Sequence, residues 1–287
     1  LISTAQVFVF LTNWTLVSVL KLGTEEYLEN KNIVTIFSNR LLFFFFNFFS
    51  IAVLYLGLYP FIKNYIPLSF EGSILAIVYG FVLALNIHFY AGFQARKMLK
   101  MQGLMLFFEK LLILGGLIIF LRFSKIDLNR IAFIYIFSGL IITGISFFIS
   151  RSSISFKWNY VIIKKIIKFS LPLIPYAVVA FFTSSYTDSF FINKYLTKAD
   201  IALYSIAYQF NGVWMQIPTI LGAIVLPLFI TSNKHESEGT TLNYISSYGV
   251  TINYIWSVFS FLFIIVLVLL LPHVYNAFNN NFFISLY

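Results

Sequence analysis

The chain has 287 residues, of which 60% are hydrophobic and only 10% are charged, and it contains 36 Phe and 18 Tyr. Soluble domains average about 45–50% apolar and about 25% charged residues, so this composition excludes a soluble globular enzyme, a disordered chain and a fibrous repeat. The net charge of +9 fits basic residues gathered in the loops of a membrane protein. It does not indicate nucleic-acid binding, because no basic stretch is hydrophilic enough to form a soluble face.

Eight apolar runs follow one another along the chain, each long enough to cross a bilayer as a helix. A spanning helix needs about 20 mostly apolar residues, and the alternating pattern of barrel strands is absent. Backbone amides in hydrocarbon must bond within their own segment. We therefore predict an all-α polytopic membrane protein with helices at approximately 2–20, 41–62, 73–95, 103–121, 131–149, 169–192, 201–230 and 247–271.

Lysine and arginine are divided unevenly between the two sides of this arrangement. The loops after the first, third, fifth and seventh runs hold twelve of them, Arg40 included, whereas the other loops hold six. Because positive residues are retained in cytoplasmic loops, the first group is predicted to be cytoplasmic.

Residues 151–168 differ from the other loops, because the sequence RSSISFKWNYVIIKKIIK mixes lysines with Trp, Tyr and Ile. One interpretation is a helix lying in the headgroup layer. The other is a plain juxtamembrane basic stretch attracted to anionic lipid. Under either interpretation this stretch is a linker between an N-terminal helix lobe, residues 1–150, and a C-terminal helix lobe, residues 169–287.

Charged residues inside the predicted helices are few. A charge at the bilayer centre costs roughly 2.5–3.5 kcal/mol, so such residues usually face a bundle interior or a water-filled cavity. Asp188, Glu109 and Lys110 are therefore the candidates for lining a cavity or coupling transport to an ion. The alternatives are a helix-end carboxylate for Asp188, an interhelical partner for Glu109 and a side chain that snorkels to the interface for Lys110.

Uncharged polar residues also lie within the predicted helices, and three of them are Asn47, Asn86 and His88. We expect interhelical hydrogen bonds from them rather than ligand contacts. The two glycines of Leu114–Gly116 indicate close helix packing. The chain has no Cys, its three His are scattered and no catalytic motif is present, so the sequence indicates no catalytic residue, metal site or cofactor.

Prolines mark positions where helices could bend. Pro172 and Pro175 open the sixth predicted helix, and Pro218 and Pro227 interrupt the seventh. Proline removes an amide donor and clashes with the carbonyl four residues back, so we predict a kink near Pro218.

The stretch from Phe169 to Pro227 resembles the polysaccharide transporter family, the Wzx-type flippases of the multidrug/oligosaccharidyl-lipid/polysaccharide exporter superfamily. The resemblance consists of a proline pair opening a helix, Asp188, Phe-Phe-Ile-x-Lys-Tyr-Leu, and then Leu-Tyr-Ser-x-Ala, which contains Tyr204 and Ala207. Ala202 stands where the family usually carries Gly. The alignment implies a two-lobe bundle of twelve to fourteen helices, of which this chain holds the second through the ninth; we expect helices to be missing at each end.

The resemblance implies a transporter, not an enzyme, that flips undecaprenyl-diphosphate-linked oligosaccharide units for cell-surface polysaccharide such as O-antigen, lipopolysaccharide or capsule. It implies the bacterial cytoplasmic (inner) membrane, with membrane lipid and polysaccharide polymerase machinery as partners. The alternative within the superfamily is a cation-coupled multidrug or small-molecule exporter. A membrane glycosyltransferase is disfavoured by outer loops of only about ten residues, and a scaffold that transports nothing is disfavoured by the cost of intramembrane charges.

Overall fold

The computed structural model describes residues 1–63, 68–123, 128–182, 249–251 and 253–266, and the single residues 188, 197, 204, 208 and 269. The chain forms two compact units, Leu1–Thr187 and Asp188–Tyr287. Within the described residues the elements are helices without strands, and six helices are long and apolar enough to cross a membrane. The predicted class, an all-α polytopic membrane protein, is confirmed. The division into two lobes joined by residues 151–168 stays a prediction.

The first predicted helix, 2–20, is not continuous. Two helical segments, Ile2–Asn13 and Leu16–Asn30, meet at 51°. The first is α1 (Ile2–Asn13); the second combines α2 (Leu16–Ser18), a π-helical turn η1 (Val19–Gly23) and α3 (Thr24–Asn30). Hydroxyls bond back to carbonyls on both sides of the break, Thr12 to Phe8 at 2.7 Å and Ser18 to Thr15 at 2.6 Å. Such side-chain bonds compete with the backbone ladder and bend helices.

The next four predicted helices are present with longer bounds. The helix α4 (Val34–Ile62) begins before residue 41, where the prediction placed its start, because Glu26 caps its first turn. The two carboxylate oxygens of Glu26 accept hydrogen bonds from the backbone N–H groups of Thr35 and Ile36, both at 2.9 Å. The other three are α5 (Phe70–Ala95), α6 (Leu99–Phe123) and α7 (Leu128–Ser150).

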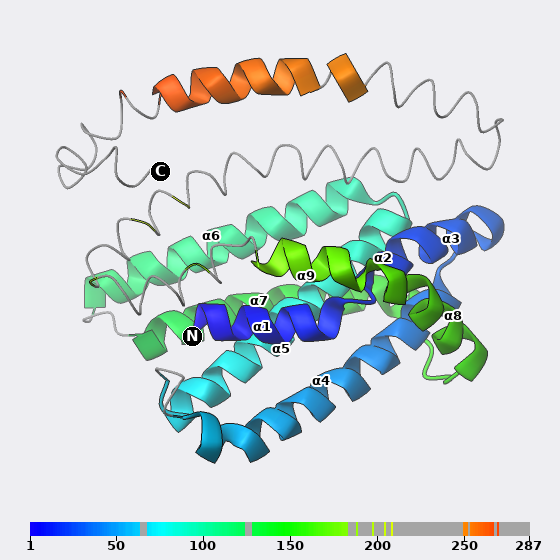
Figure 1. Ribbon diagram of the computed structural model, residues 1–287, viewed down its shortest axis with the longest axis horizontal. Coiled ribbons are helices and arrows are strands. Elements are labelled where there is room, and N and C mark those ends of the chain that lie inside the picture. The colour runs from blue at the N-terminus through cyan, green and yellow to red at the C-terminus, as the bar shows by residue number, and fades with distance from the viewer. Residues whose placement is uncertain are drawn as a thin grey trace. The chain divides into compact units, whose positions relative to one another are not determined.

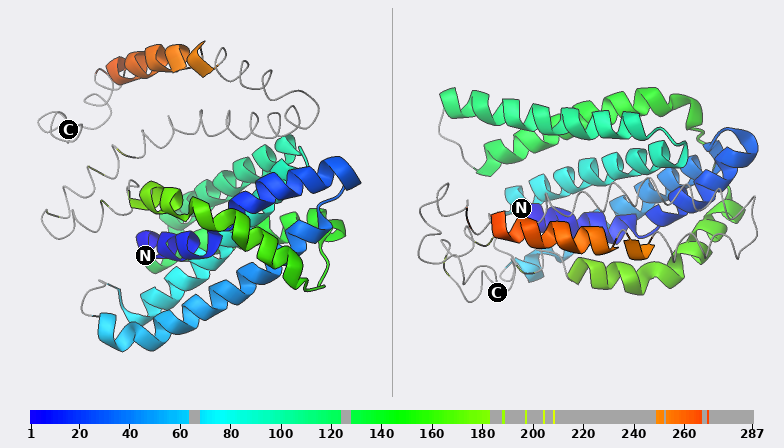
Figure 2. Two further views of the ribbon diagram at one scale, coloured as in Figure 1. Left: turned by 45° about the vertical axis from the view of Figure 1, so that its right-hand side comes forward. Right: turned by 90° about the horizontal axis from the view of Figure 1, so that it is seen from above.

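Helix α5 is the centre of the N-terminal unit, with its most extensive contacts to α1 and α7 (Figures 1 and 2). Small residues recur every fourth position on its buried surface, at Gly72, Ala76, Gly80 and Ala84. A Cβ atom at Gly80 would lie 3.0 Å from the Ala5 carbonyl oxygen. Small residues of this kind let helices approach closely where lipid supplies no hydrophobic driving force.

Large apolar side chains cover the outside of this unit as well as its core. Phe37, Phe44 and Phe89 are buried between α1, α4 and α5. Phe46, Phe107 and Phe137 are instead exposed by more than 60% on α4, α6 and α7. Exposed apolar surface on this scale fits contact with lipid rather than water.

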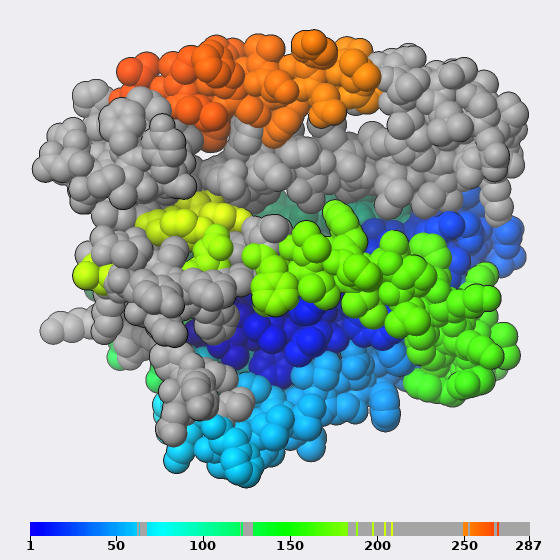
Figure 3. Space-filling model, viewed as in Figure 1, coloured from blue at the N-terminus to red at the C-terminus, as the bar shows by residue number. Residues whose placement is uncertain are grey.

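After α7 the chain passes through a 3₁₀ turn η2 (Arg151–Ser153) into α8 (Tyr160–Ser170), a second 3₁₀ turn η3 (Leu171–Leu173) and α9 (Ile174–Phe182). Figure 3 shows this stretch in green at the surface. Pro172 lies within η3, and Pro175 lies in the first turn of α9, where a missing amide hydrogen breaks no intrahelical bond.

In the second unit, Gly249–Val266 is helical, within the predicted helix 247–271. The predicted helix 201–230 lies outside the described residues except for Tyr204 and Tyr208, which are helical. Pro218, Pro227 and Ala207 lie outside the described residues, so the kink near Pro218 stays a prediction.

Candidate functional site

A buried arginine is the most unusual residue of the N-terminal unit. Arg40 lies in the second turn of α4, within a candidate membrane span, and its side chain is 0% exposed. The prediction counted Arg40 among the cytoplasmic loop cations, which is wrong. The helix starts at Val34 and carries Arg40 inwards, against the break in the first span.

Arg40 is held by neutral acceptors from two other segments. Its Nε–H donates to the Thr15 hydroxyl at 3.3 Å, and Nη1 donates to Nδ1 of His88 at 2.8 Å. Nη2 donates to the carbonyl of Thr12 at 3.5 Å and to the side-chain oxygen of Asn13. No carboxylate pairs with Arg40 among the described residues.

The position of Arg40 explains how the protein accommodates both the charge and the broken helix. The last carbonyls of a helix have no intrahelical donor, and the C-terminal end of a helix carries partial negative charge. Arg40 supplies donors and a positive charge at that end of α1. The guanidinium therefore stabilises the break, and the break supplies the acceptors that a buried guanidinium needs.

His88 completes this group from α5. Because its Nδ1 accepts from Arg40, its proton must reside on Nε2 and the ring must be neutral. Nε2 is buried and has no hydrogen-bond partner within the described part of the chain. The ring stacks on Phe37, with centroids 4.3 Å apart. We call Thr12, Asn13, Thr15, Arg40 and His88 the Arg40 cluster.

The other two polar residues predicted to bond between helices do so. The Asn86 side chain donates to the Gly139 carbonyl at 3.2 Å and accepts from the Thr143 hydroxyl at 2.7 Å, which joins α5 to α7. The Asn47 side chain donates to the Leu11 carbonyl at 3.1 Å, which joins α4 to α1. The expectation of interhelical hydrogen bonds is therefore confirmed for Asn47, Asn86 and His88.

Glu109 is buried at the interface of α6 with α5. It accepts a hydrogen bond from the Tyr90 hydroxyl at 2.8 Å. The neighbouring Lys110 is exposed, on the same surface as Phe107 and Leu111. The structure thus separates these two predicted residues, with Glu109 inside the helix bundle and Lys110 outside it.

Asp188 is half-buried in the second unit and accepts a hydrogen bond from the hydroxyl of Tyr204. The structure therefore joins a predicted coupling residue to a predicted motif residue. Asp188 and Glu109 share one arrangement, a carboxylate bonded to a tyrosine hydroxyl from another segment of the chain.

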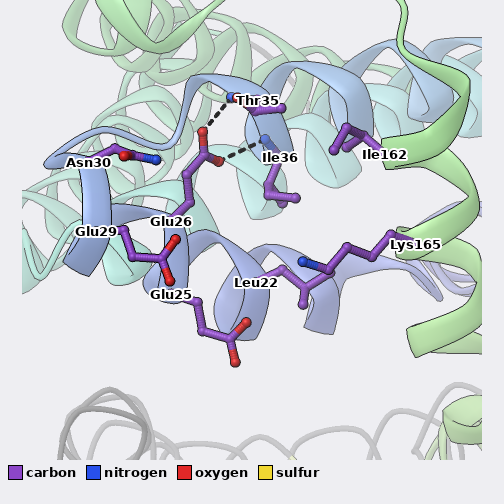
Figure 4. Close-up of a pocket in the computed structure, with 9 residues that line it drawn as sticks. All are labelled: Leu22, Glu25, Glu26, Glu29, Asn30, Thr35, Ile36, Ile162 and Lys165. Atoms are coloured by element: carbon purple, nitrogen blue, oxygen red, sulfur yellow. Dashed lines mark hydrogen bonds between the residues drawn. The ribbon is translucent and has the colours of Figure 1, made fainter. Parts of the chain in front are cut away.

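A polar pocket of about 230 Å³ lies at the end of the N-terminal unit where α3, α4 and α8 meet. Glu25, Glu26, Glu29 and Asn30 line it from α3, and Lys165 reaches in from α8 (Figure 4). The Glu26 carboxylate is already used as the cap of α4. No group of His, Asp or Glu suited to a metal ion occurs among the described residues.

In the comparison with protein families, the chain matches a family described as polysaccharide biosynthesis protein over residues 42–251. The chain belongs to this family. The matched range begins within α4, continues through α9, and includes Glu109, Asp188, Tyr204 and Ala207. Searches of the curated proteins and of the solved structures gave no match.

Proposed function

We propose that this polysaccharide biosynthesis protein flips lipid-linked oligosaccharide units, carried on undecaprenyl diphosphate, across the bacterial cytoplasmic membrane for cell-surface polysaccharide assembly. The observation that carries the proposal is the family match over residues 42–251 in a chain built from membrane-spanning helices. A role as a transporter without enzymatic chemistry fits both. A polymerase that takes up the delivered units on the outer side is the partner that this role requires.

The physical problem of this reaction is the headgroup. A diphosphate and a hydroxyl-rich glycan lose their hydration in hydrocarbon at a cost of several kcal/mol for each unpaired polar group. A transporter lowers that cost by enclosing the headgroup between helix lobes that open to one side at a time. The broken first span supports this proposal, because helices that re-orient during transport need a point at which they can bend. The Arg40 cluster lies at that point and links α1, α4 and α5 by polar contacts.

Asp188 and Glu109 are the candidates for coupling this movement to protons. Each accepts a hydrogen bond from a tyrosine, Tyr204 and Tyr90 respectively. Protonation of a carboxylate removes the charge that makes such a bond strong. In each pair, proton binding would thereby weaken the contact between the two segments of the chain, and proton release would strengthen it.

The test uses cells whose own flippase for lipid-linked oligosaccharide has been deleted, complemented with the protein or with Asp188→Asn. We expect the wild type to restore surface polysaccharide and Asp188→Asn to leave lipid-linked units accumulated on the cytoplasmic face. The measurement is the fraction of lipid-linked glycan that an added glycosidase can reach in intact cells. The proposal would be contradicted if the wild-type protein left the accumulation of lipid-linked glycan on the cytoplasmic face unchanged. If deletion of the gene for this protein in its own organism also lowered resistance to small toxic molecules, the protein would be identified as an exporter.

A further inference from the structure

Residues 151–170 are attached to the N-terminal unit by hydrogen bonds to α4. The Ser38 hydroxyl donates to the Ser153 carbonyl at 3.1 Å and accepts from the backbone N–H of Ser155 at 2.8 Å. The side-chain oxygen of Asn39 accepts from the backbone N–H of Asn159 at 2.7 Å. These bonds attach the segment between α7 and α8 to the first turns of α4.

Helix α8 then presents two different faces. Ile163 and Ile166 are buried, and Ile166 packs with Leu22 and Ile36. The opposite face is exposed and carries Lys164, Lys165 and Lys168. A helix with this division of residues lies along a surface, with its apolar side covered by the protein.

Aromatic side chains precede this basic face. Phe156, Trp158 and Tyr160 are 77%, 54% and 70% exposed, at the end of the molecule predicted to be cytoplasmic. Amphipathic aromatic rings are enriched at the level of the lipid headgroups. Their exposure beside lysines is typical of a segment that rests in the interface of a bilayer.

The bilayer boundary can be placed along α8 and α9. The whole stretch Tyr160–Phe182 is long and apolar enough to span a membrane, but three lysines in one short helix would be costly in hydrocarbon. The 3₁₀ turn η3, with Pro172, separates α8 from α9. The crossing part therefore begins after Lys168, and α8 lies in the headgroup layer.

Two of the lysines have no anionic partner within the part of the chain that the structure describes. Lys164 and Lys168 are four residues apart on one face, where like charges repel. Neither is bonded to a carboxylate among the described residues. The nearby acidic residues of α3, Glu25 and Glu29, line the pocket that Lys165 enters (Figure 4). The described residues thus leave this basic face open to an anion.

We infer that Phe156, Trp158 and Tyr160, together with Lys157, Lys164 and Lys168, form a binding surface for the headgroups of anionic phospholipids in the leaflet on this side. We call these six residues the interfacial surface. The rings sit at headgroup level and the ammonium groups bind lipid phosphates. Each lysine near an anionic surface strengthens binding by about fivefold.

The experiment uses Trp158 as a reporter, with Trp14, Trp214 and Trp256 changed to Phe. The full chain is placed in phosphatidylcholine nanodiscs containing a minor fraction of brominated lipid, which quenches tryptophan on contact. We expect brominated phosphatidylglycerol to quench Trp158 more than brominated phosphatidylcholine does. Lys164→Gln with Lys168→Gln should reduce this preference at least fivefold, whereas Lys100→Gln, at an exposed lysine of α6, should leave it unchanged.

A second variant separates the aromatic part from the charged part. Phe156→Ser should lower quenching by both brominated lipids, because the segment sits less deeply, and should leave the preference for phosphatidylglycerol in place. Thermal unfolding of each variant confirms that the protein is folded. Equal quenching by the two lipids in the parent chain, or a preference that survives loss of both lysines, would overturn the inference; loss of transport has no bearing on this readout.

Discussion

Arg40 shows how a single buried cation can be satisfied without an acid. Its donors meet a hydroxyl, an imidazole nitrogen, an amide oxygen and a carbonyl, all supplied by the broken first span and by α5. The acceptors of Thr12, Thr15 and His88 would otherwise be buried polar groups without a donor, each at a cost of about 1–3 kcal/mol. The charge and the break therefore depend on each other.

Replacing Arg40 by Met should destabilise the protein by about 3 kcal/mol or more, since several acceptors lose their donor at once. Arg40→Lys should recover only part of this loss, because an ammonium group cannot match the directions of a guanidinium. The measurement is the midpoint of thermal unfolding in detergent. Arg122→Met, at an exposed arginine in the last turn of α6, is the control and should shift it little; equal shifts for Arg40 and Arg122 would contradict the arrangement described.

The bond between Tyr90 and Glu109 can be measured by a double-mutant cycle. Tyr90→Phe and Glu109→Gln should each destabilise the protein, and the double variant should lose less than the sum of the two. We expect a coupling free energy of about 1–2 kcal/mol, since the bond is buried. Strictly additive losses in unfolding free energy would show that the two side chains do not interact.

At the scale of elements, close approach between helices is set by where glycine faces a neighbour. Gly116 of α6 lies against α7, where an added Cβ atom would come within 2.8 Å of the Ile134 side chain. The adjacent Gly115 has nothing within 4 Å of such an atom. The predicted packing role of this glycine pair is therefore confirmed for Gly116 and wrong for Gly115.

This contrast gives a matched pair of substitutions. Gly116→Ala should destabilise the protein by about 1 kcal/mol or more, because Ile134 must shift in a packed interface. Gly115→Ala should be neutral or stabilising by up to about 1 kcal/mol, since alanine favours helix over glycine. Unfolding midpoints of the two variants in one detergent decide the matter, and the reverse order would contradict the packing of α6 on α7.

The limits of sequence prediction follow from particular residues. Asn47, Asn86 and His88 were predictable because a polar group in an apolar span must find a partner on another helix. The break at Trp14–Thr15 was not, because neither proline nor glycine marks it and its acceptors are satisfied by a residue far along the chain. Arg40 was misplaced for a related reason: the cap that starts α4 at Val34 comes from Glu26, and no pattern within residues 34–40 indicates it.

At the scale of the whole molecule, the lysines and arginines predict the orientation in the membrane. Moving Arg40 from the loops into the bundle changes the cytoplasmic count from twelve to eleven, against six on the other side, so the direction of the bias is unchanged. The exposed Ser152, beside α8, and the exposed Lys63, at the far end of α4, should therefore lie on opposite sides.

The absence of cysteine allows a direct test of this orientation. Lys63→Cys should react with a membrane-impermeant maleimide added to intact cells, and Ser152→Cys should react only after the membrane is permeabilised. Labelled protein on a gel is the readout, and the unsubstituted chain is the blank. Labelling of Ser152→Cys alone in intact cells would reverse the predicted topology.

The carboxylate of Glu26 has a mechanical consequence. Because the Glu26 carboxylate of α3 binds the first amides of α4, a rotation of α3 must move the start of α4 with it. The segment that leads into α8 is attached to the same turns of α4 through Ser38 and Asn39. The three helices at this end of the unit, α3, α4 and α8, are thus expected to move together. Any change in the 51° angle between the two segments of the first span must then come from movement of α1 relative to these three helices. Arg40 lies at the contact between α1 and the three helices.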